Sequence, residues 1–84
     1  MTLRILSPSG GELRLDVRKV FFPGTDGSFE VLEGHAALLA ALGPGEIRWE
    51  GQSAESKNIN GNSCRIKGGF VKVENNELKA AVEL

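Results

Sequence analysis

Apolar side chains recur at every second residue along most of this 84-residue chain. The alternation is clearest over residues 13–18, 46–50, 71–74 and 77–84, where the intervening residues are charged or small. A period of two is typical of strands with one buried face, whereas a helix repeats every three to four residues. Turn-forming residues separate these segments, as in Ser-Pro-Ser-Gly-Gly at 7–11. The pattern predicts about eight or more short strands in an all-β sandwich or barrel.

The same alternation predicts where the chain bends. Val20 is out of step with Val17, which indicates a bulge or a tight bend near Arg18–Lys19. The Gly68–Gly69 pair predicts a kink. Asn75–Asn76 predicts a type I′ hairpin turn, because asparagine tolerates the left-handed backbone that this turn requires.

Alternation and turn-forming residues also give predictions for Leu84 and for residues 51–60. Leu84 is in phase with the apolar residues before it and is expected in the core. Residues 51–56 are polar and are predicted to form a loop. Residues 57–60 form a weak candidate strand that ends at Gly61–Asn62.

The segment from His35 to Leu42 departs from the alternation. It reads His-Ala-Ala-Leu-Leu-Ala-Ala-Leu, between Gly34 and Gly43-Pro44-Gly45. Propensity alone predicts one or two helical turns here. A turn near His35 followed by a short strand is the alternative, and we favour it because sheet context easily overrides a short propensity window.

Length and composition limit the classes of protein to consider. A chain of 84 residues is expected to form one domain, residues 1–84. Its net charge of −1 gives no reason to expect a nucleic acid or an anionic membrane surface as partner. The single cysteine excludes an internal disulfide and favours a reducing compartment. With no signal peptide and no apolar run of about 18 residues, direct membrane insertion is not expected, and any membrane link would go through a partner.

Catalytic chemistry has little support in the composition. There is one His, one Cys, no Tyr and no phosphate-binding loop motif. We expect His35 to be structural or to face a protein partner, and Cys64 to be a buried, inert thiol. No catalytic residue, cofactor or metal ligand is predicted. The acidic side chains in exposed strand positions are expected to form a solvated sheet face: Asp16, Glu46, Glu50, Glu74, Glu77 and Glu83.

The aromatic residues are assigned mainly to the core. Trp49 and the four Phe residues are more often packing residues than ligand platforms in so small a domain. Phe21 and Phe22 are adjacent, so in a strand they point to opposite faces, and one could anchor an interface. A small β domain without evident chemistry is best interpreted as a binding part of something larger.

Three blocks of residues, in order, carry a resemblance to a known family. They are Met1 to Glu12, the glycine-rich stretch Pro23 to Leu39 containing Pro-Gly-Thr-Asp-Gly-Ser-Phe, and Leu42 to Arg48 with the later Lys67 to Val73 and Asn75 to Lys79. The whole chain resembles the N-terminal β-sandwich of the epsilon subunit of bacterial F-type ATP synthase. The resemblance implies a two-sheet β-sandwich of about ten strands. It also implies a non-catalytic rotor subunit of the central stalk, peripheral on the cytoplasmic face of the bacterial inner membrane.

The resemblance also suggests partners and contact residues. Members of the family bind the gamma subunit and rest on the ring of c subunits, which couples proton flow to ATP synthesis in the alpha/beta catalytic head. By this analogy one loop faces the c ring, and a second segment lies toward gamma. The expected c-ring contacts are Asp26, Gly27, Ser28, Phe29 and Glu30. The expected gamma contacts are His35, Ala36, Leu38 and Leu39.

Several residues depart from the family pattern. The family usually has Gly where this chain has Glu30, Pro or Ala where it has Glu33, and often Pro where it has Ala37. Ser28 stands at a position that is acidic in many members, and Glu30 could restore that charge on the same strand face. The detailed c-ring contacts are therefore expected to differ from those of other members.

The length also departs from the family. Most bacterial members continue as a two-helix hairpin that can block ATP hydrolysis and in some members binds ATP. The chain ends at Leu84, so it is expected to lack this inhibitory arm if 84 residues is its natural length, and a truncation is the alternative. We expect the 84-residue chain alone not to bind ATP, which isothermal titration calorimetry would test.

Two other functions are weighed against the rotor subunit. An unrelated β adaptor binding a peptide or single-stranded nucleic acid would need a basic stripe with interleaved aromatics. In the sequence, the aromatic residues Phe21, Phe22, Phe29 and Phe70 are not interleaved with a Lys/Arg cluster, which argues against this function. A small enzyme with a single catalytic His lacks partner residues for that role.

Overall fold

The computed structural model describes residues 1–51 and 62–84. This part of the chain contains nine strands and no helix. The strands are β1 (Thr2–Leu6), β2 (Glu12–Asp16), β3 (Lys19–Phe22), β4 (Phe29–Leu32), β5 (Leu38–Leu42), β6 (Gly45–Glu50), β7 (Ser63–Ile66), β8 (Gly68–Glu74) and β9 (Glu77–Glu83). The weak strand predicted at 57–60, and the loop predicted at 51–56 apart from Gly51, lie outside the described residues.

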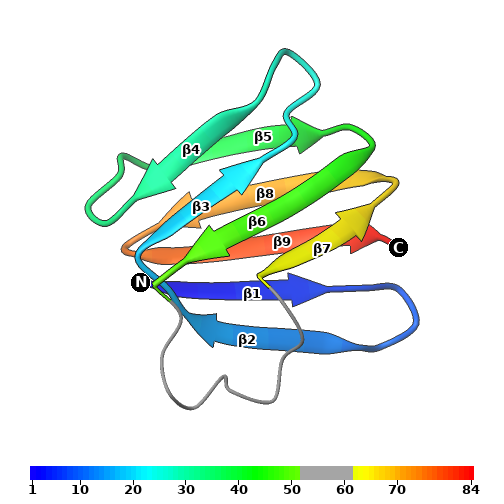
Figure 1. Cartoon of the computed structure of the whole chain (residues 1–84), viewed down its shortest axis with the longest axis horizontal. Coiled ribbons are helices and arrows are strands. Elements are labelled where there is room, and N and C mark those ends of the chain that lie inside the picture. The colour runs from blue at the N-terminus through cyan, green and yellow to red at the C-terminus, as the bar shows by residue number, and fades with distance from the viewer. Residues whose placement is uncertain (52–61) are drawn as a thin grey trace.

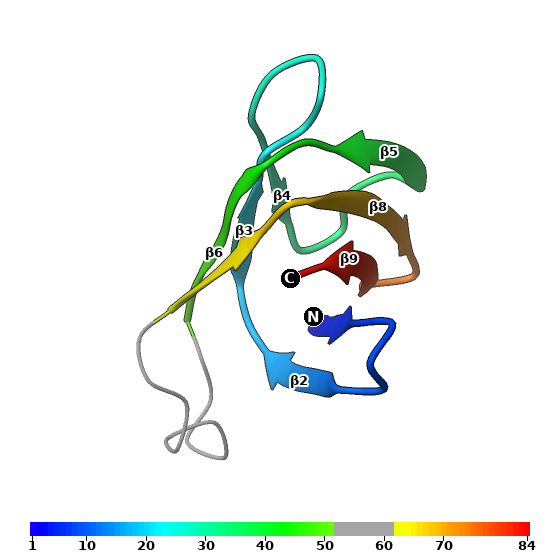
Figure 2. The ribbon, with the colours of Figure 1, turned by 90° about the vertical axis from the view of Figure 1, so that its right-hand side faces the viewer.

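The strands form two sheets that pack face to face (Figures 1 and 2). The five-stranded sheet has the order β2-β1-β9-β8-β5, and the four-stranded sheet has the order β4-β3-β6-β7. Neighbouring strands are antiparallel except β1 and β9, which pair in parallel from Thr2↔Glu77 to Leu6↔Ala81. The prediction of an all-β, two-sheet sandwich is therefore confirmed, with nine described strands against about ten expected.

The core lies between the two sheets and follows the predicted alternation. Leu3, Val71 and Leu78 of the five-stranded sheet are fully buried, and Val20, Ile47 and Trp49 of the four-stranded sheet meet them from the other side. Trp49 is 1% exposed, so its assignment to the core is confirmed. In β3 Phe22 points inward and is buried, and the half-buried Phe21 points outward, as their adjacency predicted.

The prediction for Leu84 was wrong, because its side chain is 59% exposed. The ladder between β8 and β9 ends at the pair Gly68↔Glu83, so Leu84 has no opposite residue across the ladder. Alternation places a side chain in the core only while the strand continues beneath the other sheet.

The bend near Arg18–Lys19 is the point where the chain changes sheets. Val17 N–H donates to Met1 O (2.9 Å) beside the five-stranded sheet, and Arg18 N–H donates to Glu50 O (3.0 Å) of the four-stranded sheet. A tight bend, rather than a bulge, thus explains the change of phase. The fourth and last crossing in the described chain joins β7 to β8, and next to it Gly69 has φ of +150°. A Cβ at Gly69 would lie 2.2 Å from Ala81 O, so this glycine lets two strands approach closely.

The structure also tests two local predictions, the strand after His35 and the turn at Asn75–Asn76. Residues 38–42 form strand β5, which pairs with β8, so sheet context overrides the helical propensity of the Ala/Leu segment. Asn75 and Asn76 have φ of 52° and 60° and join β8 to β9, as predicted for a type I′ turn.

Candidate functional site

The β3–β4 loop, residues 23–28, is built around two glycines. Gly27 has φ of +125°, and its N–H donates to Gly24 O (3.1 Å), which closes the turn. A Cβ on Gly24 would lie 2.6 Å from Gly27 O and 3.0 Å from the ring of Phe29. The loop is tied to β5, because Thr25 N–H donates to Ala41 O (3.1 Å) and Gly43 N–H donates to Pro23 O (2.8 Å). The sequence therefore fixes a compact, supported loop rather than a linker.

The five residues predicted to contact the c ring occupy three different environments. Asp26, Gly27 and Ser28 are exposed in the loop. Phe29 is half-buried and stacks on Phe22, with ring centroids 5.5 Å apart, so much of its side chain packs against the core. Glu30 is exposed on the outer face of the four-stranded sheet, opposite Phe21 of β3. Only the exposed loop residues and Glu30 offer a fully accessible surface.

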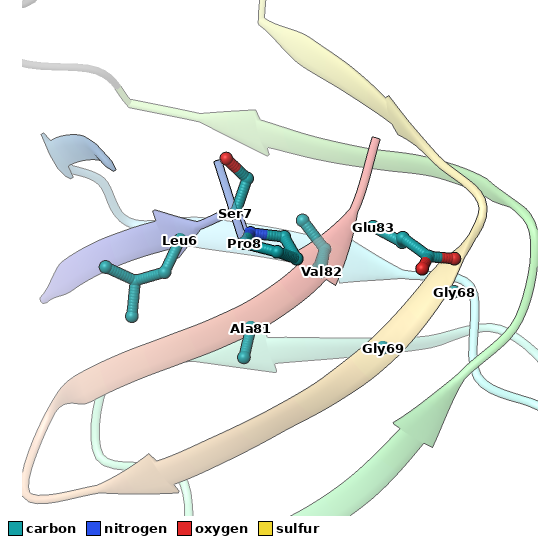
Figure 3. Close-up of a pocket in the computed structure, with 8 residues that line it drawn as sticks. All are labelled: Leu6, Ser7, Pro8, Gly68, Gly69, Ala81, Val82 and Glu83. Carbon is teal, nitrogen blue, oxygen red and sulfur yellow. The ribbon is translucent and has the colours of Figure 1, made fainter. Parts of the chain in front are cut away.

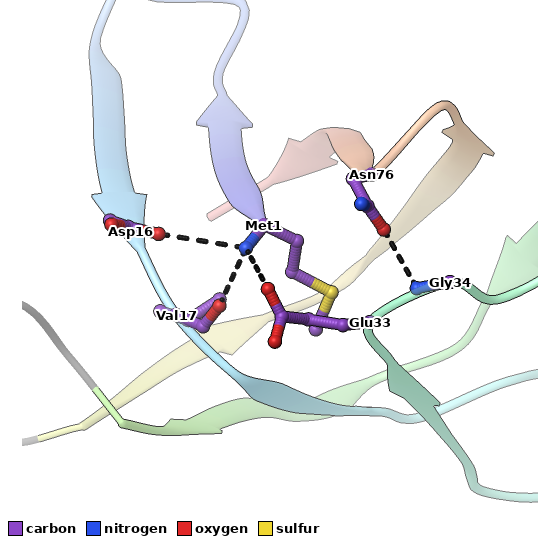
Figure 4. A network of polar contacts seen from close by, with 6 residues as sticks. All are labelled: Met1, Asp16, Val17, Glu33, Gly34 and Asn76. Carbon is purple, nitrogen blue, oxygen red and sulfur yellow. Dashed lines mark hydrogen bonds and ion pairs between the residues drawn. The ribbon is translucent and has the colours of Figure 1, made fainter.

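The β4–β5 turn is held from two sides (Figure 4). The carboxylate of Glu33 lies 3.2 Å from the Met1 amino nitrogen, which also donates to Val17 O (3.0 Å) and lies 3.5 Å from Asp16. Next to Glu33, Gly34 has φ of +79°, and its N–H donates to Asn76 Oδ1 (2.7 Å). These contacts tie the turn to the start of β1 and to the β8–β9 hairpin, so they fix the position of the segment that follows.

That segment carries the predicted gamma contacts. His35 and Ala36 are exposed, and His35 Nδ1 lies 2.7 Å from Ala36 O, in keeping with a histidine that hydrogen-bonds to the loop backbone. Leu38 points inward and packs against the core. Leu39 points outward and is 74% exposed.

The structure brings members of the two predicted sets together. His35 and Ala36 lie at one end of β4 and the β3–β4 loop at the other (Figure 1). Leu39, however, lines a cavity together with Gly24, Asp26, Gly27 and Phe29. The residues predicted to contact gamma are therefore divided: Leu39 lies with the predicted c-ring residues, and His35 and Ala36 lie at the opposite end of β4.

An apolar row on the outer face of the five-stranded sheet was missed by the sequence reasoning. The register places Ala41, Phe70, Ala81 and Leu6 side by side across β5, β8, β9 and β1. Phe70 is 60% exposed, and Leu39 lies one outward position along β5 from Ala41. A signal was present: because Val71 and Val73 are in the core phase, alternation puts Phe70 outside.

The other end of the same face is charged. Arg4 donates from Nε to Glu12 Oε2 (3.0 Å), and this bond, with the charge of Glu12, raises the pKa of the Arg4 guanidinium. Lys72 lies 3.6 Å from Glu74 on β8. On the outer face, the apolar row through Phe70 is thus followed by a charged row, in which Leu39 lies at the edge opposite Lys72 and Arg4 lies two strands further on.

The surroundings of Phe21 correct one argument made from the sequence. Lys19 Nζ lies 5.7 Å and Arg48 Cζ 5.3 Å from the centre of the Phe21 ring. The aromatic residue therefore does have basic neighbours, which come from β3 itself and from β6. The sequence did not reveal this because Arg48 is brought alongside only by the pairing Phe21↔Arg48.

The remaining features show little catalytic character. The cavity of Figure 3 lies where Leu6 to Pro8 meet Gly68–Gly69 and the end of β9, and Glu83 is the one charged residue in its lining. Cys64 is half-buried rather than buried, and burial raises the pKa of its thiol, which makes it less reactive. In residues 1–51 and 62–84, no three His, Cys, Asp or Glu side chains are grouped as metal ligands. No helix of the described chain is long and apolar enough to cross a membrane.

Comparison with known proteins identifies the family. Residues 1–83 match the model of the ATP synthase delta/epsilon chain β-sandwich domain. The chain belongs to this family. It is 39% identical over 83 residues to the ATP synthase epsilon chain of a Nitratiruptor species, covering 99% of this chain and 60% of that protein. It is 35% identical over 82 residues to the epsilon chain of Nostoc punctiforme, covering 98% of this chain and 57% of the relative. The chain thus spans about 60% of the length of these relatives.

Solved structures show the same fold. A structure of the central stalk and c ring of the Tetrahymena thermophila mitochondrial ATP synthase contains a chain that matches with a TM-score of 0.82 at 23% identity. The match covers all of this chain and 63% of that one. A chain in the Euglena gracilis mitochondrial ATP synthase matches with a TM-score of 0.68 at 20% identity, over 95% of this chain and 48% of that one.

Proposed function

We propose that this protein is a non-catalytic subunit of the central stalk of an F-type ATP synthase. In this role it binds the gamma subunit and the c ring, and so helps to couple proton flow to ATP synthesis in the alpha/beta head. It acts at the cytoplasmic face of the bacterial inner membrane, to which it is attached through the complex. It contributes no catalytic residue and no cofactor site of its own.

The observation that carries this proposal is the match along nearly the whole chain to proteins named ATP synthase epsilon chain. The similar folds in mitochondrial ATP synthase structures agree with a place in the stalk. The exposed residues around β4 supply candidate contact surfaces: Asp26, Gly27, Ser28 and Glu30 for the c ring, and His35, Ala36 and Leu39 for gamma. Phe29 and Leu38 are assigned a supporting role, because both pack against the core.

The first experiment is an affinity pull-down of the tagged chain from detergent-solubilised membranes of its source organism, with mass spectrometry of the bound proteins. Recovery of gamma with c, alpha and beta subunits is the expected result. Recovery of none of them by the folded domain would overturn the proposal.

Contact between the β3–β4 loop and the c ring can be tested with a matched pair of variants. Ser28→Lys adds bulk and charge to the exposed loop, so we expect it to reduce recovery of the c subunit severalfold. Ser63→Lys makes the same chemical change on β7, where Ser63 is also exposed, and is expected to have little effect. Surface changes of this kind rarely alter stability by more than about 0.5 kcal/mol, so folding should be preserved in both. Equal losses in the two variants would contradict the loop assignment.

One observation favours the second candidate, an adaptor for a peptide or single-stranded nucleic acid. Phe21 lies between Lys19 and Arg48 on an outer sheet face, which is a feature of aromatic stacking sites. The same face carries Glu30 opposite Phe21, and Glu46 and Glu50 on β6, so it is not a basic groove. An adaptor would bind a peptide or single-stranded nucleic acid, and would not recover gamma, in the same pull-down.

A further inference from the structure

The amino group of Met1 lies where three acceptor groups converge from different parts of the chain (Figure 4). It donates to Val17 O (3.0 Å), and it lies 3.2 Å from the carboxylate of Glu33 and 3.5 Å from that of Asp16. Met1 is itself a core residue, 9% exposed, and its hydrogen bond to Val17 O is buried. A protonated amino group carries one positive charge and three N–H donors, which suits three acceptors of which two are anionic. The position is therefore built for an ammonium group.

An acylated amino group could not serve the same three acceptors. Acylation leaves the nitrogen with a single N–H donor and no charge. That donor is needed for Val17 O, because Val17 N–H donates to Met1 O (2.9 Å) in return and the reciprocal pair extends the ladder between β1 and β2. No donor and no positive charge would then remain for the carboxylates of Glu33 and Asp16. Both side chains are more than half exposed, so they would turn to water.

The contact of Met1 with Glu33 matters because it supports the β4–β5 turn. Glu33 joins the turn to the start of β1, and Gly34 N–H joins it to the β8–β9 hairpin by donating to Asn76 Oδ1 (2.7 Å). Residues 35–37, which follow, are exposed and lie outside the described strands. Without the Glu33 contact, the hydrogen bond of Gly34 would be the one remaining contact between residues 33–34 and a side chain of the described chain. The exposed segment would then move more freely.

We infer that the free ammonium group of Met1 positions the β4–β5 turn through Glu33, and that acylation of this group releases the turn and weakens the binding of gamma at His35 and Ala36. Met1 is thus a positioning residue, and its amino group is a site at which modification changes the predicted contact surface. The effect on gamma rests on the proposed function, whereas the effect on the turn does not.

The first test compares two chemically synthesised 84-residue chains, one with a free Met1 amine and one with an acetyl group on it. Amide hydrogen exchange is measured in both. We expect acetylation to accelerate exchange at Gly34 and His35 about threefold or more, because the turn loses one of its supports. The amide of Ala80, in the central strand β9, should keep its rate. Unchanged rates at Gly34 and His35, or an equal acceleration at Ala80, would overturn the inference.

The second test asks whether the amino group acts through Glu33. Glu33→Gln removes the charge of the partner and keeps its size. In the free-amine chain it should accelerate exchange at Gly34 as acetylation does. In the acetylated chain it should change that rate by less than about twofold, because the contact is already lost. Glu83→Gln is the matched control, the same change at an exposed residue at the far end of β9, and should have little effect in either chain. Additive effects of acetylation and Glu33→Gln would overturn the inference.

Binding to purified gamma tests the consequence for the contact surface. We expect acetylation and Glu33→Gln each to raise the Kd about threefold or more, and Glu83→Gln to leave it within about twofold. An unchanged Kd in an acetylated chain whose Gly34 amide exchanges faster would overturn the inference and leave the proposed function standing. No binding of gamma by the free-amine chain would overturn the proposed function, and the exchange rates at Gly34 and His35 would still decide whether the amino group positions the turn.

Discussion

At the scale of single residues, Gly24 is a position where the β3–β4 loop leaves no room for a side chain. We expect Gly24→Ala to lower the free energy of unfolding by about 1–3 kcal/mol, because the new Cβ would press on Gly27 O and the ring of Phe29. Gly43→Ala is the control, since a Cβ there would meet its nearest atoms at 3.9 Å. Urea denaturation followed by Trp49 fluorescence measures both. A loss at Gly43 as large as that at Gly24 would contradict the steric explanation.

Individual residue environments could be predicted where alternation alone decides them. Trp49, Val71 and Phe22 lie inside as expected. Alternation failed at Leu84, where the ladder ends, and it gave no measure of partial burial at Cys64. It also could not place Arg48 beside Phe21, because that contact depends on which strands are neighbours.

At the scale of elements, the β8–β9 hairpin does more than reverse the chain. Asn75 and Asn76 both have positive φ, but only the side chain of Asn76 accepts a hydrogen bond from Gly34 N–H. Both Asn75→Ala and Asn76→Ala should destabilise the turn. We expect Asn76→Ala to cost about 1 kcal/mol more, because it also removes this bond.

Chemical denaturation of the two alanine variants gives the difference. Asn76→Asp keeps an acceptor oxygen and a residue that tolerates positive φ, so it should recover most of the loss. Hydrogen exchange at Gly34 adds a direct readout and should accelerate only in Asn76→Ala. Equal destabilisation by the two alanine variants would show that the bond contributes nothing.

The elements could be predicted better than their arrangement. The strand at 38–42 and the turn at Asn75–Asn76 follow from local pattern and turn chemistry. The seating of the β3–β4 loop on the edge of β5 could not be predicted, since it joins Thr25 to Ala41 across the intervening strand β4. For the same reason the sequence separated Leu39 from the β3–β4 loop, and the structure places them in one cavity.

At the scale of the whole molecule, the two ends of the chain form the centre of the five-stranded sheet. β1 pairs in parallel with β9, and β9 in turn pairs with β8. A parallel pair between the first and last strands closes the longest loop available, which is costly in entropy until the strands between them are folded. The sandwich should therefore fold as one cooperative unit, with β9 completing it.

Removal of β9 tests this directly. A chain lacking residues 77–84 loses Leu78, Ala80 and Val82 from the core and leaves β1 and β8 without their shared partner. Burial of an aliphatic side chain contributes about 1.5–3 kcal/mol, so the loss of Leu78 and Val82 together with their ladder approaches the whole stability of a domain this small. We expect this chain to be unfolded, with the far-UV circular dichroism of a coil and the fluorescence of an exposed Trp49.

Removal of Leu84 alone is the control, and it should change the unfolding midpoint little, because the Leu84 side chain is 59% exposed and follows the last paired residue. A chain without residues 77–84 that still melted cooperatively with Trp49 buried would show that the four-stranded sheet is stable without the centre of its partner, and would contradict the single cooperative unit.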